Sequence, residues 1–213
     1  MSRRRSVANS NRVDPGEHRA PRDQSFRRHI AYAAARLIAE EGLTDYLAAK
    51  MKAAHSLGCG PKEVLPDNHE IEAALREHLA IFQRDSQPQE LRELREIALE
   101  VMRRLLRFSP LLVGPIFTGT ANRFSIIELE VVVEDEKALD LFLLKENVAY
   151  EVVARGSGNL RKQRRVYEFS FGNVPIMACA FMSASERAQH GIHGTAGNDH
   201  ADLAGVRALL QAT

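Results

Sequence analysis

The sequence has few cysteines, almost no net charge and no long apolar run. Its two cysteines, Cys59 and Cys179, lie far apart and form no CxxC or Cys/His spacing, which fits a reducing compartment better than a disulfide-built secreted fold. The formal net charge of +1 provides no whole-molecule attraction to nucleic acid or to an acidic membrane. The sequence has no run of about 18 apolar residues, which a membrane-spanning helix needs, and no apolar segment typical of a signal peptide. It therefore predicts a cytoplasmic protein with no membrane span.

The first 26 residues also lack apolar periodicity. They are rich in Arg, Ser, Asn, Asp and Pro, and such a segment buries too little surface to offset its ordering entropy. Residues 1–26 are therefore predicted to be a disordered basic arm. Arg3, Arg4 and Arg5 are able to contact phosphates, although charge runs of this kind are usually solvated.

Residues 27–107 have the apolar period of helices. A stripe through Ile30, Leu37 and Ile38 ends at Gly42, and later stripes predict three further helices. Asp67 followed by Glu70 matches a capping box at one helix start. The prediction is a small helical bundle or cap with short loops.

From residue 108 the period becomes that of strands. Strands are predicted at 111–118, 125–133, 148–154, 166–171 and 174–181, with a helix at 134–147. The link Gly172-Asn173 is a hairpin signal, because both residues tolerate a positive φ. Residues 183–213 are predicted to be a loose tail with a closing helix, so the fold class is α+β, with a helical bundle followed by a mixed sheet with flanking helices.

Two acidic residues lie close to a glycine turn in this second part. Strand alternation places Glu128 and Glu130 on one face, separated by an inward-pointing Leu129. Two carboxylates so placed can share Mg²⁺, which prefers oxygen ligands. Gly119-Thr120 would present backbone N–H groups and a hydroxyl to phosphates. This is the division of labour that metal-assisted phosphoryl transfer needs.

Because of these residues, the segment 108–182 resembles the nucleotidyltransferase superfamily, which includes polymerase-beta-like and aminoglycoside-modifying enzymes. The resemblance lies in an apolar strand, the pair Gly119-Thr120 in the place of Gly-Ser, and Glu128 and Glu130 in the place of two metal-binding acids. It implies a nucleotidyltransferase-like sheet that transfers a nucleotidyl group from a nucleoside triphosphate to a hydroxyl acceptor with Mg²⁺. The acceptor is left open among RNA, protein and a small molecule. The third family acid is missing from residues 174–180, and Glu168 is its predicted substitute.

A basic loop extends the predicted nucleotide site. The resemblance implies nucleotide contacts from Gly119, Thr120 and Arg123, and the loop adds Arg161, Lys162, Arg164 and Arg165. This loop is able to close over a triphosphate or an RNA backbone, or it is a solvated hairpin loop.

Three other interpretations remain beside the transferase. Because the third acid is missing, the chain is alternatively a catalytically inactive module that binds a nucleotide, RNA or a protein. Residues 30–57 superficially resemble the first helices of tetracycline-repressor-type DNA-binding regulators, but the predicted strands oppose a wholly helical fold. His190, His193 and His200 with Asp199 suggest a metal site, but they lie in a segment without a predicted scaffold.

Overall fold

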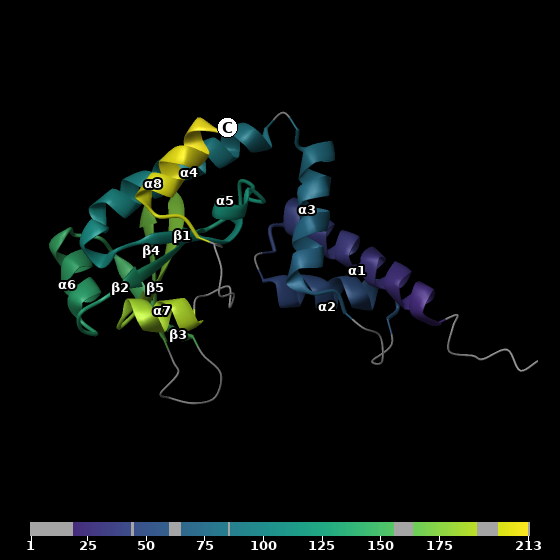
Figure 1. Cartoon of the computed structure of the whole chain (residues 1–213), viewed down its shortest axis with the longest axis horizontal. Helices are drawn as coiled ribbons and strands as arrows, with labels where there is room; N and C mark the ends of the chain where they lie inside the picture. The colour runs from purple at the N-terminus through teal and green to yellow at the C-terminus, as the bar shows by residue number, and fades with distance from the viewer. Residues whose placement is uncertain are drawn as a thin grey trace, which may run out of the picture.

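The structure is a computed structural model that describes residues 19–43, 45–59, 65–84, 86–155, 164–190 and 200–212. Within these ranges the chain forms eight α-helices and a five-stranded mixed sheet, with helices first (Figure 1). The α+β class and the order of its parts are therefore confirmed. No helix in these ranges is long and apolar enough to cross a membrane.

The first three helices form a group that we call the helical unit. They are α1 (Arg19–Glu41), α2 (Tyr46–Ser56) and α3 (Asn68–Phe82). Asp45 caps α2 through the N–H groups of Leu47 and Ala48, and Asp67 and Glu70 form the predicted capping box of α3. Helix α1 begins at Arg19, so the end of the predicted arm is helical. Pro21 lies in its first turn, where no backbone hydrogen bond is lost.

The fourth helix, α4 (Gln87–Arg104), packs with the sheet rather than with α1–α3. Its apolar stripe, which includes Leu91, Ala98 and Met102, belongs to the same buried cluster as the strands. The sequence groups α4 with the preceding helices because its period is the same, but the period does not specify the partner. We call α4 and everything after it the sheet unit.

The sheet unit contains β1 (Leu111–Val113), β2 (Ile127–Val132), β3 (Tyr150–Arg155), β4 (Arg164–Phe171) and β5 (Val174–Phe181). Their order is β1-β2-β5-β4-β3. β2 and β5 run parallel, and every other neighbouring pair is antiparallel. The predicted β4–β5 hairpin is confirmed, with Gly172 at φ +59° in its turn.

Residues 111–118, predicted as one strand, divide into β1 and a short helix, α5 (Gly114–Thr118). Gly114 has φ +71°, and Pro115 follows in the first turn of α5, where proline favours a helix start. A short apolar run does not by itself distinguish a strand from a helix.

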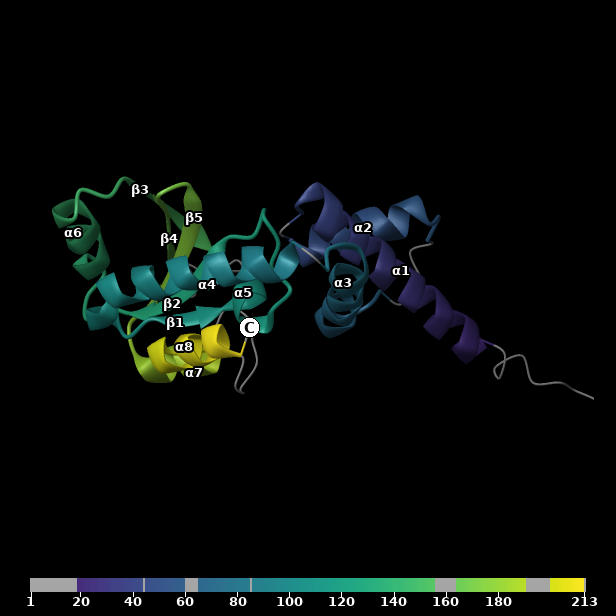
Figure 2. The same cartoon turned by 90° about the horizontal axis from the view of Figure 1, so that it is seen from above.

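The two faces of the sheet differ in what covers them. One face packs against α4, α6 (Ala138–Lys145) and α8 (Leu203–Gln211) in the main core, and α4 and α8 lie side by side (Figures 1 and 2). The opposite face carries a small cluster of Val166, Met177, Cys179 and Phe181. Helix α7 (Ala184–His190) contacts β2 and β5. We call this second side the acidic face, because Glu128, Glu130 and Glu168 lie on it.

The predicted tail is joined to the sheet. Ala201 forms a β-bridge with Leu112 through two backbone hydrogen bonds of 2.8 and 2.9 Å, and α8 then packs on α4. His193 and Asp199, which belong to the metal site considered from the sequence, lie outside the described residues.

Candidate functional site

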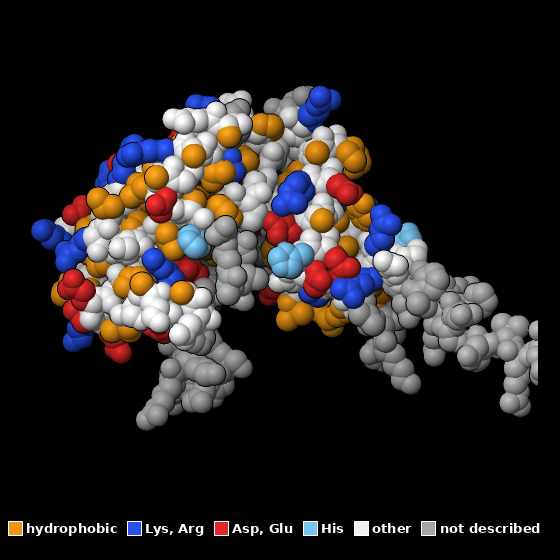
Figure 3. All heavy atoms as spheres, in the orientation of Figure 1, with side chains coloured by type: hydrophobic (Ala, Val, Ile, Leu, Met, Phe, Trp, Pro, Cys, Tyr) orange, Lys and Arg blue, Asp and Glu red, His pale blue; other side chains and the backbone are white. Residues whose placement is uncertain are grey.

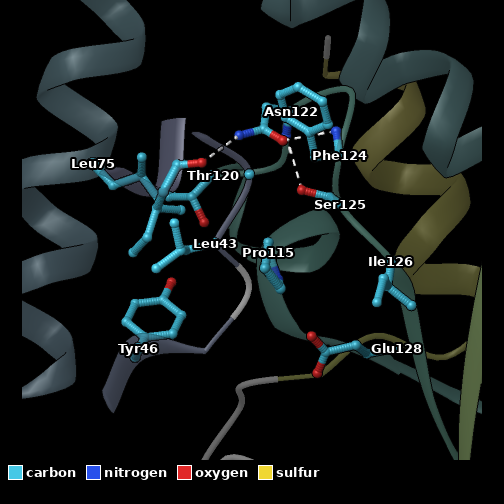
Figure 4. Close-up of a pocket in the computed structure, with 12 residues that line it drawn as sticks. Leu43, Tyr46, Leu75, Pro115, Thr120, Asn122, Phe124, Ser125, Ile126 and Glu128 are labelled. Atoms are coloured by element: carbon cyan, nitrogen blue, oxygen red, sulfur yellow. Dashed lines mark hydrogen bonds between the residues drawn. The ribbon is translucent and has the colours of Figure 1, made fainter. Parts of the chain in front are cut away.

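A narrow cleft lies between the helical unit and the sheet unit (Figure 4). The helical unit contributes Ile38, Gly42, Leu43, Tyr46 and Leu75, and the sheet unit contributes Pro115, Thr120, Asn122, Phe124, Ser125, Ile126 and Glu128. Its cavity volume is about 30 Å³, which is room for about one water molecule. Any larger ligand requires the two units to move apart.

Glu128 lies at one side of this cleft and contacts the β1–α5 turn. A Cβ atom on Gly114 would lie 2.9 Å from the Glu128 carboxyl carbon. Only glycine leaves room for the carboxylate there, and only glycine readily adopts the left-handed backbone of that position. The strand-to-helix turn beside the acidic strand is therefore at Gly114, five residues before the predicted phosphate-binding Gly119.

Tyr46, the first residue of α2, brings a phenol to the same cleft from the helical unit. Burial, helped by the negative charges of Glu72 and Glu128, raises the pKa of Tyr46 to about 12, although a hydrogen bond with Thr120 opposes this shift. The phenol therefore stays protonated near neutral pH and is a hydrogen-bond donor. The Thr120 hydroxyl, which also pairs with Thr118 at 3.0 Å, is buried beside it.

The turn at residues 122–125 joins the two units. Asn122 donates from Nδ2 to the Ile38 carbonyl at 3.3 Å and accepts from the Phe124 N–H at 2.9 Å. The Phe124 ring packs against Gly42, where a Cβ atom would lie 2.9 Å from the ring. Gly42 has φ +71°, so glycine serves both the backbone conformation and the close approach.

The predicted acidic pair shares a face, but its members have different surroundings. Leu129 between them is buried in the main core, which confirms the predicted alternation. Glu130 is only 5% exposed, and α7 brings Arg187 close to it. Burial lowers the pKa of Arg187 and the charge of Glu130 partly raises it. Glu130 is thus a neighbour of a half-buried cation, whereas Glu128 borders the cleft.

Glu168 lies on the same face as Glu128 but two strands away. Both residues pair in register with Met177 of β5, from opposite sides, so two strand spacings of about 4.8 Å separate their backbones. Glu168 borders a second, open cavity of about 670 Å³ together with Glu151 and Met177. Within the described ranges, no group of three Asp, Glu, His or Cys side chains is placed to hold a metal ion.

The backbone N–H groups of the predicted phosphate turn have partners within the chain. The N–H groups of Gly119 and Thr120 both donate to the Pro115 carbonyl at 2.9 Å, and Gly119, at φ +84°, ends α5. No helix begins there, because residues 120–126 lead directly into β2. These two N–H groups are therefore engaged within the helix cap, while the Thr120 side chain lines the cleft.

Of the predicted basic residues that the structure describes, Arg164 and Arg165 lie on opposite faces of β4 and only Arg123 lies near the cleft. Arg165 forms an ion pair with Asp140 of α6 at 2.9 Å, on the core side of the sheet. Arg164 points to the other side and lies over the Phe181 ring at 5.2 Å, and its buried Nε has no hydrogen-bond partner. Arg123 stacks on Phe124 at 4.7 Å, next to the cleft. Arg161 and Lys162 lie outside the described residues.

Charges of both signs are interspersed over the molecular surface visible in Figure 3. On that side the described Lys and Arg side chains do not gather into one basic surface. Sequence reasoning also missed Tyr46 and Asn122 as cleft residues and Gly114 as the residue that makes room for Glu128. The only available signal was the Gly114-Pro115 dipeptide, which marks a turn.

Comparison with known proteins finds no matching family model, no matching curated protein and no matching solved structure. The residues of the cleft are therefore the basis on which a function can be assigned to the chain.

Proposed function

We propose that this chain is a nucleotide-binding protein with a degenerate nucleotidyltransferase site, and that the nucleotide enters the cleft between α2 and β2. The observation that carries the proposal is the Glu128 carboxylate, lodged against Gly114 and facing the cleft. A carboxylate is a suitable ligand for the Mg²⁺ that accompanies nucleotide phosphates.

The other groups of the cleft support a polar ligand. Tyr46 supplies a protonated phenol, and Arg123 supplies a cation next to Phe124. The Asn122–Ile38 hydrogen bond and the hydrogen bond between Tyr46 and Thr120 link the two units, and both would break when the units separate to admit a nucleotide. The cleft would then approach the several hundred Å³ that small-molecule sites require.

Binding without transfer is favoured by the surroundings of the other two acids. Glu130 lies beside Arg187, and a nearby cation reduces the attraction of a carboxylate for Mg²⁺. Glu168 borders a different cavity. A second candidate function, nucleotidyl transfer with Mg²⁺ held by Glu128 and Glu130 and assisted by Glu168, is favoured by the register that places all three on one face.

The test is titration of the purified chain with each of the four ribonucleoside triphosphates, with and without Mg²⁺, by calorimetry and by thermal unfolding. We expect one nucleotide to bind, and at 100 times its dissociation constant to stabilise the fold by about 2.7 kcal/mol. Glu128→Gln should remove the Mg²⁺-dependent part of the affinity. Glu168→Gln is the matched control, because it makes the same change on the same face outside the cleft.

Two results would contradict binding without transfer. The first is the absence of binding by any of the four nucleotides. The second is incorporation of label from an α-labelled nucleotide into the protein, added RNA or a cell extract, with loss of incorporation in Glu128→Gln. That second result would establish the transferase instead.

A further inference from the structure

β3 is the edge of the sheet that remains open in the described part of the chain. It is six residues long and pairs only with β4 there. The opposite edge, β1, has three residues and is joined to Ala201 by a bridge. Val152 and Val153 of β3 are 40% and 38% exposed. An open edge with an exposed apolar centre and no proline is a template for pairing with a further strand.

The charged positions of β3 are in register with like charges of their own chain. In the β3–β4 register, Glu151 is the partner of Glu168 and Arg155 is the partner of Arg164. Like charges directly opposite one another on neighbouring strands are destabilising. Glu151 and Arg155 are four residues apart, so their positions belong to the same face of the sheet.

This pattern is complementary to itself. If two β3 strands pair antiparallel about a two-fold axis through Val153, Glu151 of each copy lies opposite Arg155 of the other. Val153 then lies opposite Val153, and Val152 lies opposite Ala154. Across the junction the positions on the acidic face read Glu168, Glu151, Arg155 and Arg164, so a glutamate position of one copy is next to an arginine position of the other. An isologous contact makes this pair twice.

We propose that the protein forms a homodimer in which the two β3 strands pair antiparallel in this register and continue the sheet from one copy into the other. A second copy of the chain is the partner that fits this edge. When one β3 strand is paired antiparallel with another, the order of charges and the apolar centre of each are complementary to those of the other. This surface is separate from the cleft between α2 and β2.

The test is the mass of the full chain in solution, measured by sedimentation equilibrium over a wide concentration range. We expect a dimer for the natural sequence. Glu151→Arg alone and Arg155→Glu alone each place two like-charge pairs at the junction and should weaken the dimer on the order of tenfold or more. The double variant Glu151→Arg/Arg155→Glu restores both pairs and should restore the dimer.

A mixing experiment separates this contact from an effect on folding. The Glu151→Arg chain carries two arginines at the junction and the Arg155→Glu chain carries two glutamates, so an equimolar mixture should form a heterodimer although each variant alone is largely monomeric. A natural chain that is monomeric at every concentration would overturn the proposal. Single variants that dimerise as well as the natural chain would overturn it equally.

Discussion

The helical unit and the sheet unit bury different kinds of side chain. Among the described residues, eight of the thirteen in the buried cluster of α1–α3 are alanines, whereas alanine provides four of the twenty-one in the main cluster of the sheet unit. Alanine lets helices approach closely, but it removes little apolar surface from water, and the hydrophobic contribution scales with that area. The helical unit is therefore held together by less burial.

Polar contacts supplement the small core of the helical unit. Arg27 of α1 forms ion pairs with Asp67 and Glu70 at the start of α3, the second at 2.6 Å. Exposed ion pairs of this kind contribute little and are weakened by salt. The sheet unit is therefore the stable scaffold, and the helical unit is the more easily displaced wall of the cleft.

The largest effect on stability is expected when a buried leucine is truncated in the core of each unit. Leu129 and Leu75 are both fully buried, and replacing either with alanine removes the same atoms at an expected cost of about 2–5 kcal/mol. By differential scanning calorimetry we expect two transitions. The first transition is that of the helical unit and the second that of the sheet unit. Leu75→Ala should lower only the midpoint temperature of the first transition, and Leu129→Ala should lower that of the second. A single transition that both substitutions shift equally would show that the units unfold together.

A smaller effect is expected from substitution of the glycine beside Glu128. Gly114→Ala places a side chain in a left-handed conformation, which costs roughly 1–2 kcal/mol, and also displaces the Glu128 carboxylate. At Gly172, with φ +59°, an added Cβ atom would have no other atom within 4 Å, so Gly172→Ala carries only the conformational cost. Urea unfolding should therefore show a greater loss for Gly114→Ala. Equal losses would mean that Glu128 moves aside freely.

The smallest expected effect is a pH dependence confined to the helical unit. The N–H of Glu70, which donates to the Asp67 carboxylate at 2.9 Å, lowers the pKa of Asp67, and the charge of Arg27 lowers it further. A lowered pKa in the folded state stabilises the fold above the unfolded pKa of about 3.8, and this stabilisation is lost as the pH falls through the folded value.

Acidification below about pH 4 should therefore lower the midpoint temperature of the first transition more in the natural chain than in Asp67→Asn. The asparagine keeps the helix cap but cannot ionise. Asp202→Asn is the matched control, since Asp202 caps α8 of the sheet unit through the Gly205 N–H. The same pH dependence in the natural chain and Asp67→Asn would contradict the assignment.

Local signals predicted much of the fold. The capping box at Asp67 and Glu70, the hairpin at Gly172 and the alternation around Leu129 each involve residues within a few positions of one another, and each is confirmed. The secondary structure of residues 111–118 was not predictable in this way, because a short apolar run bounded by glycine fits a strand or a helix.

The candidate site was predicted less fully because its surroundings are assembled from distant segments. Glu130 is buried and lies next to Arg187 of α7, and Tyr46 reaches the cleft from the helical unit. Arg164 and Arg165 were grouped as one basic loop, but strand alternation sends them to opposite faces of β4. The likeness to nucleotidyltransferases, the Mg²⁺ site and the nucleotide contacts stay predictions.

The parallel pairing of β2 with β5 has a consequence for synthesis of the chain. The helical unit ends at Phe82, so all three of its helices are synthesised before any strand. β2, by contrast, acquires its parallel neighbour only about 50 residues later, and such distant pairing forms slowly. A nascent chain that stops between β2 and β5 thus carries a folded helical unit beside an incomplete sheet, which is the form most open to capture by chaperones or to aggregation.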